Sequence, residues 1–330
     1  MRAPDFWNQN TFAAQLAGRL LAPLGMLYGA SVAWKAKRAA PYRPKAKVVC
    51  VGNLTAGGSG KTPIAIAIAQ ALEARGWRPV FLSRGYGGGV RAPLLIEPAT
   101  ALAAEVGDEP LLLARVAPVI VARDRAAGAK LADEKRFDVI VMDDGHQNFS
   151  VTKDLAIVVV DAQTGFGHGR ILPAGPLREP VAQGLARADA VVLAGDGNPA
   201  LSGFSGAVLR ARLVSGPAAS LAGKPVVAFA GIGRPGKFFQ SLRTLGAEIA
   251  EAHAYADHHV YTETEISRLK ANARDSKAVL VTTEKDFVRL SPAQREGIEV
   301  LPVHATFDDI AARDKLLDSL GANSAQAQRR

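Results

Sequence analysis

Residues 48–63 read VVCVGNLTAGGSGKTP, and this stretch decides the fold. An apolar run enters a glycine-rich turn, and the apolar residues that follow Lys61, beginning with Ile64 and Ile68, recur at every fourth position. This order predicts a buried strand, a phosphate-binding loop and a helix. Glycines let backbone N–H groups converge on an anion, and the positive end of the helix dipole adds to the attraction. The predicted ligand is therefore the phosphate chain of a nucleotide.

Two side chains of this loop have expected roles. Lys61 is expected to reach the β- and γ-phosphates, and the hydroxyl of Thr62 is expected to face a Mg²⁺ ion. Such loops usually begin with a glycine where this chain has Thr55, but the other glycines and the flanking strand and helix fit. A flexible turn with a solvated lysine is the alternative. The predicted phosphate-binding residues are Thr55, Ala56, Gly57, Gly58, Ser59, Gly60, Lys61 and Thr62.

The composition is that of a soluble globular protein. Of the 330 residues, 48% are hydrophobic and 22% are charged, so general disorder is excluded and two domains are possible. Cys50 is the only cysteine, which excludes an intrachain disulfide. It is expected to be a small core residue in a reducing compartment.

The positive charge is concentrated at the N-terminus. Eight basic residues and one acidic residue, Asp5, fall within residues 1–47, so this segment carries +7 of the formal net charge of +9. The asymmetry favours contact with an anionic surface, either lipid headgroups or nucleic acid, over a generally basic enzyme.

Residues 20–34 contain no charged side chain and are followed by Lys35, Lys37 and Arg38. The uncharged run is shorter than the roughly 20 residues that span a bilayer, and Pro23 interrupts it. We therefore expect a helix that lies in the membrane interface beside anionic lipid. The alternative is an apolar helix packed on the protein's own core. The aromatic side chains expected at the headgroup level are Trp7, Tyr28 and Trp34.

Residues 137–147 read FDVIVMDDGHQ, an apolar strand that ends in the two carboxylates Asp143 and Asp144. After a phosphate-binding loop, a strand that ends in carboxylates is the usual means of holding Mg²⁺ beside the nucleotide. The sequence therefore predicts a metal site made by Thr62, Asp143 and Asp144. A charged pair exposed to solvent is the alternative.

Three further segments place polar residues at predicted strand ends or in loops. A strand at 79–82 leads into Ser83 and Arg84, where an open α/β sheet presents groups to a ligand. The spacing around Asp108 predicts an N-cap for the next helix, and a cap at such a junction also faces the cleft. In ADHH, at 256–259, an imidazole is available for proton transfer, and a surface loop is the equal alternative.

These elements predict an α/β fold with a mainly parallel sheet of the P-loop NTPase type, flanked by helices. A new strand and glycine turn at 225–235 begin a smaller C-terminal α/β domain. The expected parts are a membrane-associating segment with an interface helix at 1–40, the P-loop domain at 41–214, the smaller domain at 215–320 and a frayed tail at 321–330.

Seven motifs follow one another along nearly the whole chain: GNLTAGGSGKTP (52–63), LSRGYGG (82–88), VGDEP (106–110), DDGHQ (143–147), LPAGPLREP (172–180), ADHHVYTE (256–263) and TTEKD (282–286). Together they resemble those of the tetraacyldisaccharide 4'-kinases, the lipid A 4'-kinases of Gram-negative bacteria. The resemblance implies ATP-dependent phosphorylation, with Mg²⁺, of the 4'-hydroxyl of tetraacyldisaccharide 1-phosphate in lipid A biosynthesis. It also implies peripheral or monotopic attachment to the cytoplasmic face of the inner membrane, and no obligate protein partner is expected.

The same resemblance implies roles for individual residues. Asp108 would be the catalytic base for the sugar hydroxyl, and His258 would orient it or tune its pKa. His259 is close enough to His258 to exchange roles with it. The substrate-binding residues implied by the motifs are Asn53, Ser83, Arg84, Arg178 and Glu179.

Two other classes of protein would share part of this sequence pattern. A membrane-associated P-loop ATPase that binds a protein partner would need the phosphate loop but would have no use for Asp108 and His258. A nucleic-acid-binding module is disfavoured because the basic segment is apolar in its middle and no nucleic-acid motif is present. A guanine nucleotide is disfavoured because the lysine of TEKD, at 283–286, stands one place late for a guanine-specificity loop.

Overall fold

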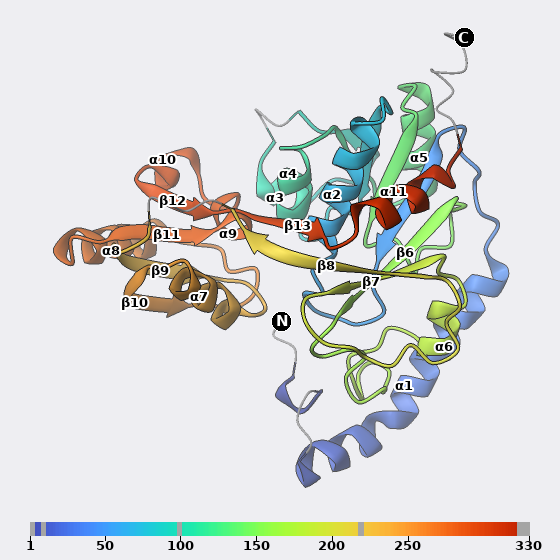
Figure 1. Cartoon of the computed structure of the whole chain (residues 1–330), viewed down its shortest axis with the longest axis horizontal. Helices are drawn as coiled ribbons and strands as arrows, with labels where there is room; N and C mark the ends of the chain where they lie inside the picture. The colour runs from blue at the N-terminus through green and yellow to red at the C-terminus, as the bar shows by residue number, and fades with distance from the viewer. Residues whose placement is uncertain (1–3, 8–10, 98–100, 217–220, 322–330) are drawn as a thin grey trace.

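Two β-sheets organise the chain, and the computed structural model describes residues 4–7, 11–97, 101–216 and 221–321 (Figure 1). The larger sheet has nine strands in the order β13-β8-β7-β6-β1-β5-β2-β4-β3. The seven neighbours from β8 to β4 run parallel, and an antiparallel strand pairs at each edge. The strands are β1 (Lys47–Gly52), β2 (Pro79–Ser83), β3 (Leu94–Leu95), β4 (Val119–Val121), β5 (Val139–Asp143), β6 (Leu155–Asp161), β7 (Ala190–Ala194), β8 (Ala207–Ser215) and β13 (Val303–Phe307).

Both faces of this sheet are covered, so its central strands β1, β5 and β6 are buried along almost their whole length. One face is covered by α2 (Lys61–Glu73), α4 (Asp108–Leu113) and α11 (Ile310–Asp318), and the short α3 (Ala103–Val106) precedes α4. The other face is covered by α5 (Arg125–Glu134) and α6 (Val181–Leu185). The predicted α/β fold is confirmed.

The smaller sheet has four parallel strands in the order β10-β9-β11-β12. Helices α7 and α8 pack on its opposite faces. Its elements are β9 (Pro225–Ala230), α7 (Pro235–Thr244), β10 (Glu248–Ala254), α8 (Glu263–Asp275), β11 (Val279–Thr283), α9 (Glu284–Phe287), α10 (Pro292–Arg295) and β12 (Ile298–Leu301). The carboxyl ends of β9 and β11 lead into loops that meet the larger domain.

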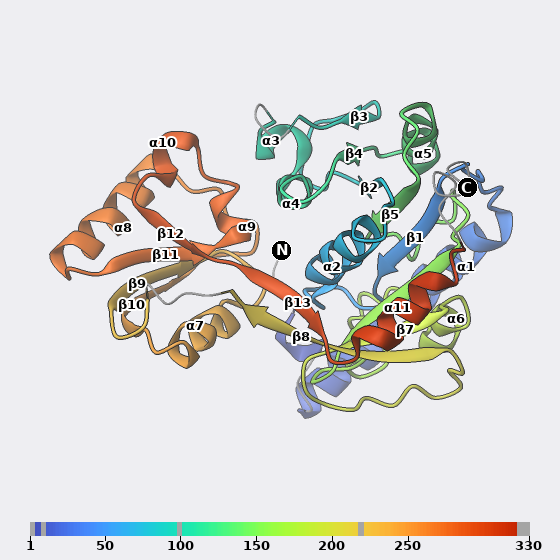
Figure 2. The ribbon, with the colours of Figure 1, turned by 45° about the horizontal axis from the view of Figure 1, so that its top comes forward.

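Strands β8 and β13 form an antiparallel ribbon that joins the two sheets (Figure 2). After β13, helix α11 buries Leu317 in the core of the larger domain. The expected smaller domain at 215–320 is therefore too long, because its sheet ends at residue 301 and residues 303–320 return to the larger domain. Sequence reasoning missed this because much of β8 and β13 is exposed and carries no continuous apolar run. The expected tail lies outside the described residues from residue 322 onward.

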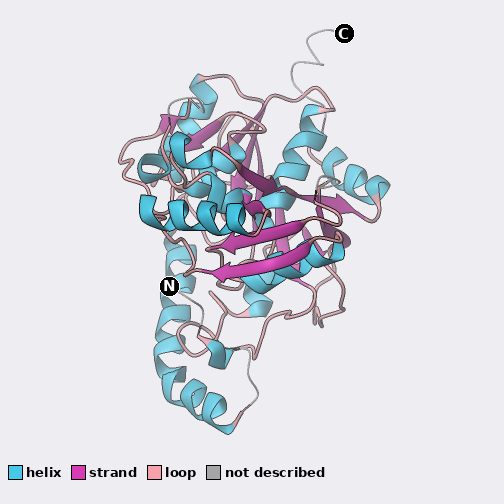
Figure 3. Ribbon diagram, turned by 90° about the vertical axis from the view of Figure 1, so that its left-hand side faces the viewer, coloured by secondary structure: helices cyan, strands magenta, loops and turns pink. Residues whose placement is uncertain are grey.

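Helix α1 (Phe12–Arg38) runs along the outside of the larger domain as one continuous helix (Figure 3). The expected interruption at Pro23 is wrong, and α1 is long and apolar enough to cross a bilayer by length and composition. Its packed side is made of small residues, because a Cβ at Gly25 would lie 2.8 Å from the carbonyl oxygen of Ile171. Its large side chains point away, and Leu20 and Leu27 are 72% and 70% exposed. Small residues thus hold α1 to the protein and leave its apolar side chains uncovered.

A short 3₁₀ turn, η1 (Asp5–Trp7), precedes α1. Trp7 is buried, and its indole Nε1 donates a hydrogen bond to the carbonyl oxygen of Pro173 at 3.1 Å. The expected place of Trp7 at the headgroup level is therefore wrong. Tyr28 and Trp34 remain exposed on α1.

Replacing Gly25 with leucine should loosen α1 from the protein. Overpacking costs about 1–3 kcal/mol, so the Tm of Gly25→Leu should fall by several degrees, although leucine is the better helix former. Ala30→Leu adds a leucine at an exposed position of the same helix and should leave the Tm within about a degree of the wild-type value. Equal midpoints for the two variants, measured by differential scanning calorimetry, would contradict the packing of α1 described above.

Candidate active site

The phosphate-binding loop between β1 and α2 has an open outer face. Added Cβ atoms at Gly57 and Gly58 would meet no atom of the described residues within 4 Å, so a ligand can approach the backbone there. Gly60 caps α2 with a φ of 83°, which a glycine adopts without steric strain. Beneath the loop, the buried Asn53 donates a hydrogen bond from Nδ2 to Oγ of Ser59 at 2.9 Å. The predicted phosphate-binding residues therefore form a braced and accessible loop.

A second segment, at 170–178, holds the phosphate loop from outside. The N–H of Ala56 donates to the carbonyl oxygen of Pro176 at 2.7 Å, and the N–H of Arg178 donates to the carbonyl oxygen of Leu54 at 2.8 Å. The same segment meets the glycine side of α1. Helix α1, this segment and the phosphate loop therefore pack as one unit.

The two predicted carboxylates lie beside the loop because β1 and β5 are neighbours in the sheet. Oγ1 of Thr62 donates to Oδ2 of Asp143 at 3.0 Å. Nζ of Lys61 lies 3.8 Å from Oδ2 of Asp144, and Nη1 of Arg178 donates to Oδ1 of Asp144 at 2.7 Å. The structure thus brings together five residues that the sequence places in three separate motifs.

The donor set suits a divalent cation. Oδ1 of Asp143 is buried and has no hydrogen-bond partner among the described residues. Burial and the nearby charges of Glu109 and Asp144 raise the pKa of Asp143 to about 7. Burial opposes ionisation of Asp144 as well, but Lys61 and Arg178 outweigh it and lower its pKa. A hard cation would neutralise this excess negative charge, and carboxylate and hydroxyl oxygens are its preferred ligands.

Glu179 and Asn53 lie behind the site. Glu179 is 1% exposed, and it accepts hydrogen bonds from Nε2 of Gln147 at 2.8 Å and from Nη2 of Arg187. Nε2 of Gln147 also donates to the carbonyl oxygen of Asn53 at 2.9 Å. The carboxylate of Glu179 is therefore occupied by internal hydrogen bonds. Nδ2 of Asn53 is occupied by Ser59, but the buried Oδ1 of Asn53 has no hydrogen-bond partner among the described residues. Arg178, from the same motif as Glu179, reaches the carboxylate of Asp144.

Asp108 is the first residue of α4, and Gly107 rather than Asp108 caps the helix, so the capping prediction is wrong. Oδ2 of Asp108 instead faces the smaller domain. It accepts a hydrogen bond from Nδ1 of His258 at 3.0 Å and from Nε of Arg289 at 2.9 Å, and Nη2 of Arg289 donates to it as well. The side chain of Asp108 is only 7% exposed. The predicted Asp–His pair is thus assembled across the two domains.

His258, and not His259, meets Asp108. The backbone of His258 is left-handed, with a φ of 59°, and its N–H donates to the carbonyl oxygen of Gly231 at 3.1 Å. His259 pairs with Glu265 at 3.1 Å and stacks on Tyr255. The adjacent imidazoles therefore face different partners.

The Asp–His pair stabilises its charged form. The hydrogen bond to Asp108 raises the pKa of His258. Burial alone would raise the pKa of Asp108, but the hydrogen bond from His258 and the charge of Arg289 outweigh it and hold that pKa well below its ordinary value. Asp108 is therefore an ionised carboxylate throughout the neutral range.

The ends of β2 and β4 add positive charge to the site. Ser83 is buried at the end of β2, and the next residue, Arg84, is exposed. At the start of α5, the guanidinium of Arg125 is buried, and its Nε has no partner among the described residues. Burial and the charge of Arg84 lower the pKa of Arg125 to about 10. Tyr86, in the glycine-rich turn after β2, is 68% exposed, and its ring centroid lies 5.9 Å from that of His258.

The sequence analysis did not identify Arg289 or Arg125 as site residues, nor the hydrogen bonds by which Gln147 links Asn53 to Glu179. The available signal for Arg289 was its spacing of three residues from Asp286, because the two side chains form an ion pair at 2.9 Å.

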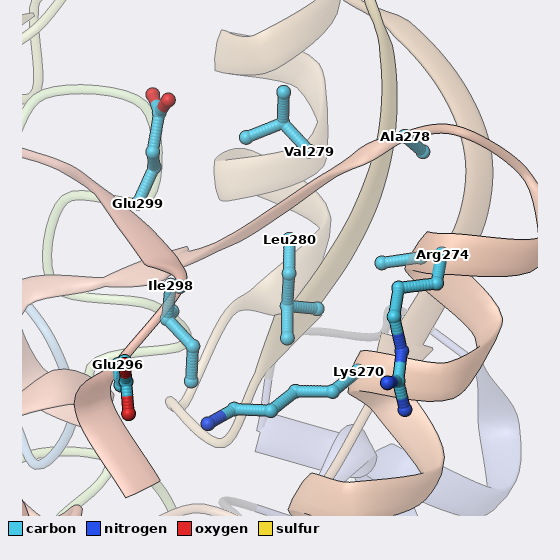
Figure 4. Close-up of a pocket in the computed structure, with 10 residues that line it drawn as sticks. Lys270, Arg274, Ala278, Val279, Leu280, Glu296, Ile298 and Glu299 are labelled. Atoms are coloured by element: carbon cyan, nitrogen blue, oxygen red, sulfur yellow. The ribbon is translucent and has the colours of Figure 1, made fainter. Parts of the chain in front are cut away.

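Figure 4 shows a groove at the amino ends of β11 and β12, lined by Lys270, Arg274 and Glu296 among others. None of the site residues lies there, and we assign no function to it.

Comparisons with known proteins show which family the chain is similar to. The family model described as Tetraacyldisaccharide-1-P 4'-kinase matches residues 17–321. A tetraacyldisaccharide 4'-kinase of Rhodospirillum rubrum is 49% identical over 328 residues, covering 97% of this chain and 98% of its own. One from Methylobacterium sp. strain 4-46 is 51% identical over 321 residues, covering 94% and 95%. Among solved structures, LpxK from Aquifex aeolicus in complex with ATP matches with a TM-score of 0.76 and 27% identity, over 92% of this chain and 99% of that one.

The Asp108–His258 pair should make stability depend on pH. Because the folded state raises the pKa of His258, its pairing stabilises the protein fully below the ordinary histidine pKa of about 6.5 and loses this effect as pH rises through the raised value. The difference in free energy of unfolding between the wild type and His258→Gln should therefore shrink from pH 6 to pH 9 in urea titrations. A wild-type-to-His258→Gln difference that stays constant over this pH range would contradict the pairing.

Proposed function

The chain belongs to the Tetraacyldisaccharide-1-P 4'-kinase family, and from that premise we propose how its own residues carry out the reaction. It is a kinase that uses ATP to phosphorylate the 4'-hydroxyl of tetraacyldisaccharide 1-phosphate, a step of lipid A biosynthesis. The observation that supports our assignment of roles is the cross-domain pairing of Asp108 with His258. A protein that only hydrolysed ATP would have no use for this pair.

Asp108 is the proposed base. An ionised carboxylate with a free lone pair accepts the proton of the 4'-hydroxyl as the sugar oxygen attacks the γ-phosphorus. The bond from that phosphorus to the bridging oxygen breaks, ADP leaves, and the phosphoryl group remains on the lipid. His258 holds Asp108 in place through Nδ1. Its imidazolium form stabilises the carboxylate charge in the resting site.

The phosphate chain is proposed to lie along the loop at 55–62. The backbone N–H groups of the loop and Nζ of Lys61 neutralise it, and little else is needed because phosphoryl transfer depends mainly on positioning and charge. Thr62, Asp143 and Asp144 would hold Mg²⁺, directly or through water, and the ion would neutralise charge on the transferred group. The buried Oδ1 of Asp143, which has no hydrogen-bond partner among the described residues, supports this assignment.

The acceptor lies, in our proposal, between the exposed face of the loop and the Asp108–His258 pair. Ser83, Arg84 and Arg178 provide the polar and cationic contacts there. Asn53 and Glu179 contribute by bracing the site, because Nδ2 of Asn53 donates to Ser59 in the loop and the carboxylate of Glu179 accepts from Gln147.

Asp108→Asn should separate base catalysis from nucleotide binding. The amide cannot accept the hydroxyl proton, so transfer of labelled γ-phosphate from ATP to tetraacyldisaccharide 1-phosphate in detergent micelles should fall by about 10²–10⁴-fold. The affinity for ATP should stay within about threefold, because the loop is untouched. Lys61→Ala provides the blank. Full turnover by Asp108→Asn would remove Asp108 from the chemistry, and label released as free phosphate by the wild type would favour a partner-binding ATPase.

We also propose that α1 attaches the protein to the cytoplasmic face of the inner membrane, an anionic surface that holds the lipid acceptor. The uncovered apolar side chains of α1 and the basic residues of its last turn support this placement. The packing of α1 against the segment at 170–178, which also braces the phosphate loop, would place the active site close to that surface.

Charged substitutions on the uncovered side of α1 should release the protein from membranes. The double variant Leu20→Glu and Leu27→Glu removes two exposed apolar contacts, each worth about 1.5–3 kcal/mol when buried, so binding to vesicles with anionic lipid should weaken by at least tenfold. Residual binding should fall further with added salt. Leu102→Glu changes a leucine that is 55% exposed elsewhere on the surface and should bind like the wild type. Unchanged partitioning of the double variant would contradict the proposed attachment.

A further inference from the structure

We propose that Arg289 is a positioning residue for the transfer, which orients Asp108 so that the base is complete only when the smaller domain is docked on the larger one. The inference rests on the proposed function, since it takes Asp108 as the base. Arg289 follows α9 in the smaller domain, whereas Asp108 begins α4 in the larger domain. The contact between them therefore exists only in the docked arrangement.

The two oxygens of Asp108 are used differently. Oδ2 accepts from Nδ1 of His258 and from both Nε and Nη2 of Arg289, so its lone pairs are occupied. Oδ1 accepts one hydrogen bond among the described residues, from the N–H of Glu109 at 3.0 Å. A carboxylate oxygen has two lone pairs, so Oδ1 retains one for a hydroxyl proton. By occupying Oδ2, Arg289 makes Oδ1 the oxygen that acts as the base.

Arg289 is itself held in place on its other side. Its Nη1 donates to Oδ1 of Asp286 at 2.9 Å and to the carbonyl oxygen of Gly231 at 2.8 Å. Asp286 is fully buried, and it accepts further bonds from the hydroxyls of Tyr261 and Thr283 at 2.9 and 2.6 Å. Arg289 thus transmits the position of the smaller domain to Asp108 through a guanidinium fixed on both sides.

Charge also links Arg289 to the base. Its guanidinium lies between the carboxylates of Asp108 and Asp286, and the three side chains are 6%, 7% and 0% exposed. Without it, two buried carboxylates would share a site with only His258 to compensate, which would raise the pKa of Asp108. The charged and titratable groups around Asp108 are Glu109 on α4, Lys285 and Asp286 on α9, Arg289, and Asp257 and His258 in the loop after β10.

The simpler explanation is that Arg289 only holds the domains together. The chain offers a matched control for it, because Nη1 of Arg115 pairs with Oε1 of Glu284 at 3.2 Å across the same interface. Arg115 is 54% exposed and does not touch Asp108. Removing Arg115 therefore weakens the interface without disturbing the base.

The test compares Arg289→Met, Arg289→Lys, Arg115→Met and Asp108→Asn in the full chain. The readouts are kcat for lipid phosphorylation, KM for ATP, the pH profile of kcat and the Tm. For Arg289→Met we expect kcat to fall by about 10²-fold with KM for ATP within about threefold, and the acid limb of kcat to move to higher pH. Arg289→Lys keeps the positive charge but loses the planar guanidinium with its several N–H donors. The acid limb of its kcat profile should therefore stay in place while kcat falls by about tenfold. Arg115→Met should match the wild type in kcat and pH profile.

Three outcomes would overturn the inference. One is a loss of kcat in Arg115→Met equal to that in Arg289→Met, which would reduce Arg289 to a domain contact. Another is a wild-type kcat and pH profile in Arg289→Met, or in Arg289→Lys should the methionine variant be too unstable to assay. If Asp108→Asn is inactive in these cases, the proposed function stands and only the role of Arg289 fails. The third outcome is full activity of Asp108→Asn, in which case the base assignment fails and the role of Arg289 fails with it.

Discussion

Parallel strands present their carboxyl ends at one edge of a sheet, and the site in the larger domain depends on this constraint. The phosphate loop follows β1, Asp143 ends β5, Ser83 ends β2 and Arg125 follows β4, and these four strands are neighbours in the sheet. Residues that are far apart in the chain therefore meet around one anion-binding loop. The smaller parallel sheet obeys the same rule, because Gly231 follows β9 and the turn that carries Arg289 follows β11. The site forms where the two edges face each other.

Opposite charges that are largely removed from solvent complete the site. Lys61 and Arg178 compensate Asp144 within the larger domain, and Arg289 compensates Asp108 across the interface. Such pairs are costly to break one partner at a time, because the remaining charge is left buried. They therefore favour one docked arrangement of the domains, and this arrangement keeps the carboxylate of Asp108 ionised. The hydroxyl of Thr62 and Oδ1 of Asp143, which has no hydrogen-bond partner in the part of the chain that the structure describes, are oxygen ligands of the kind that a hard cation prefers.

Much of the fold followed from local sequence pattern. The apolar spacing after Lys61 predicted α2, and Ile64, Ile68 and Leu72 are indeed fully buried. The pattern failed where an element is stabilised by a partner distant in sequence. Strand β13 pairs with β8 after an intervening domain, so no local signal showed that residues 303–320 return to the larger sheet. Helix α1 continues through Pro23, and on both sides of this residue its glycines pack against residues 170–172, a contact that local helix propensity does not describe.

The sequence by itself determined the phosphate loop, the paired carboxylates at the end of β5 and the family. Each of these is recognised from short runs of adjacent residues. Only the tertiary structure decided that Asp108 faces His258 instead of capping its helix, that His259 turns away, and that Glu179 and Asn53 are internal supports. It also added Arg289, for which the sequence offered only the spacing from Asp286. The physical reason is that a hydrogen bond or ion pair acts over a few ångströms of space, and contacts between residues 150 to 181 positions apart are set by how two domains pack.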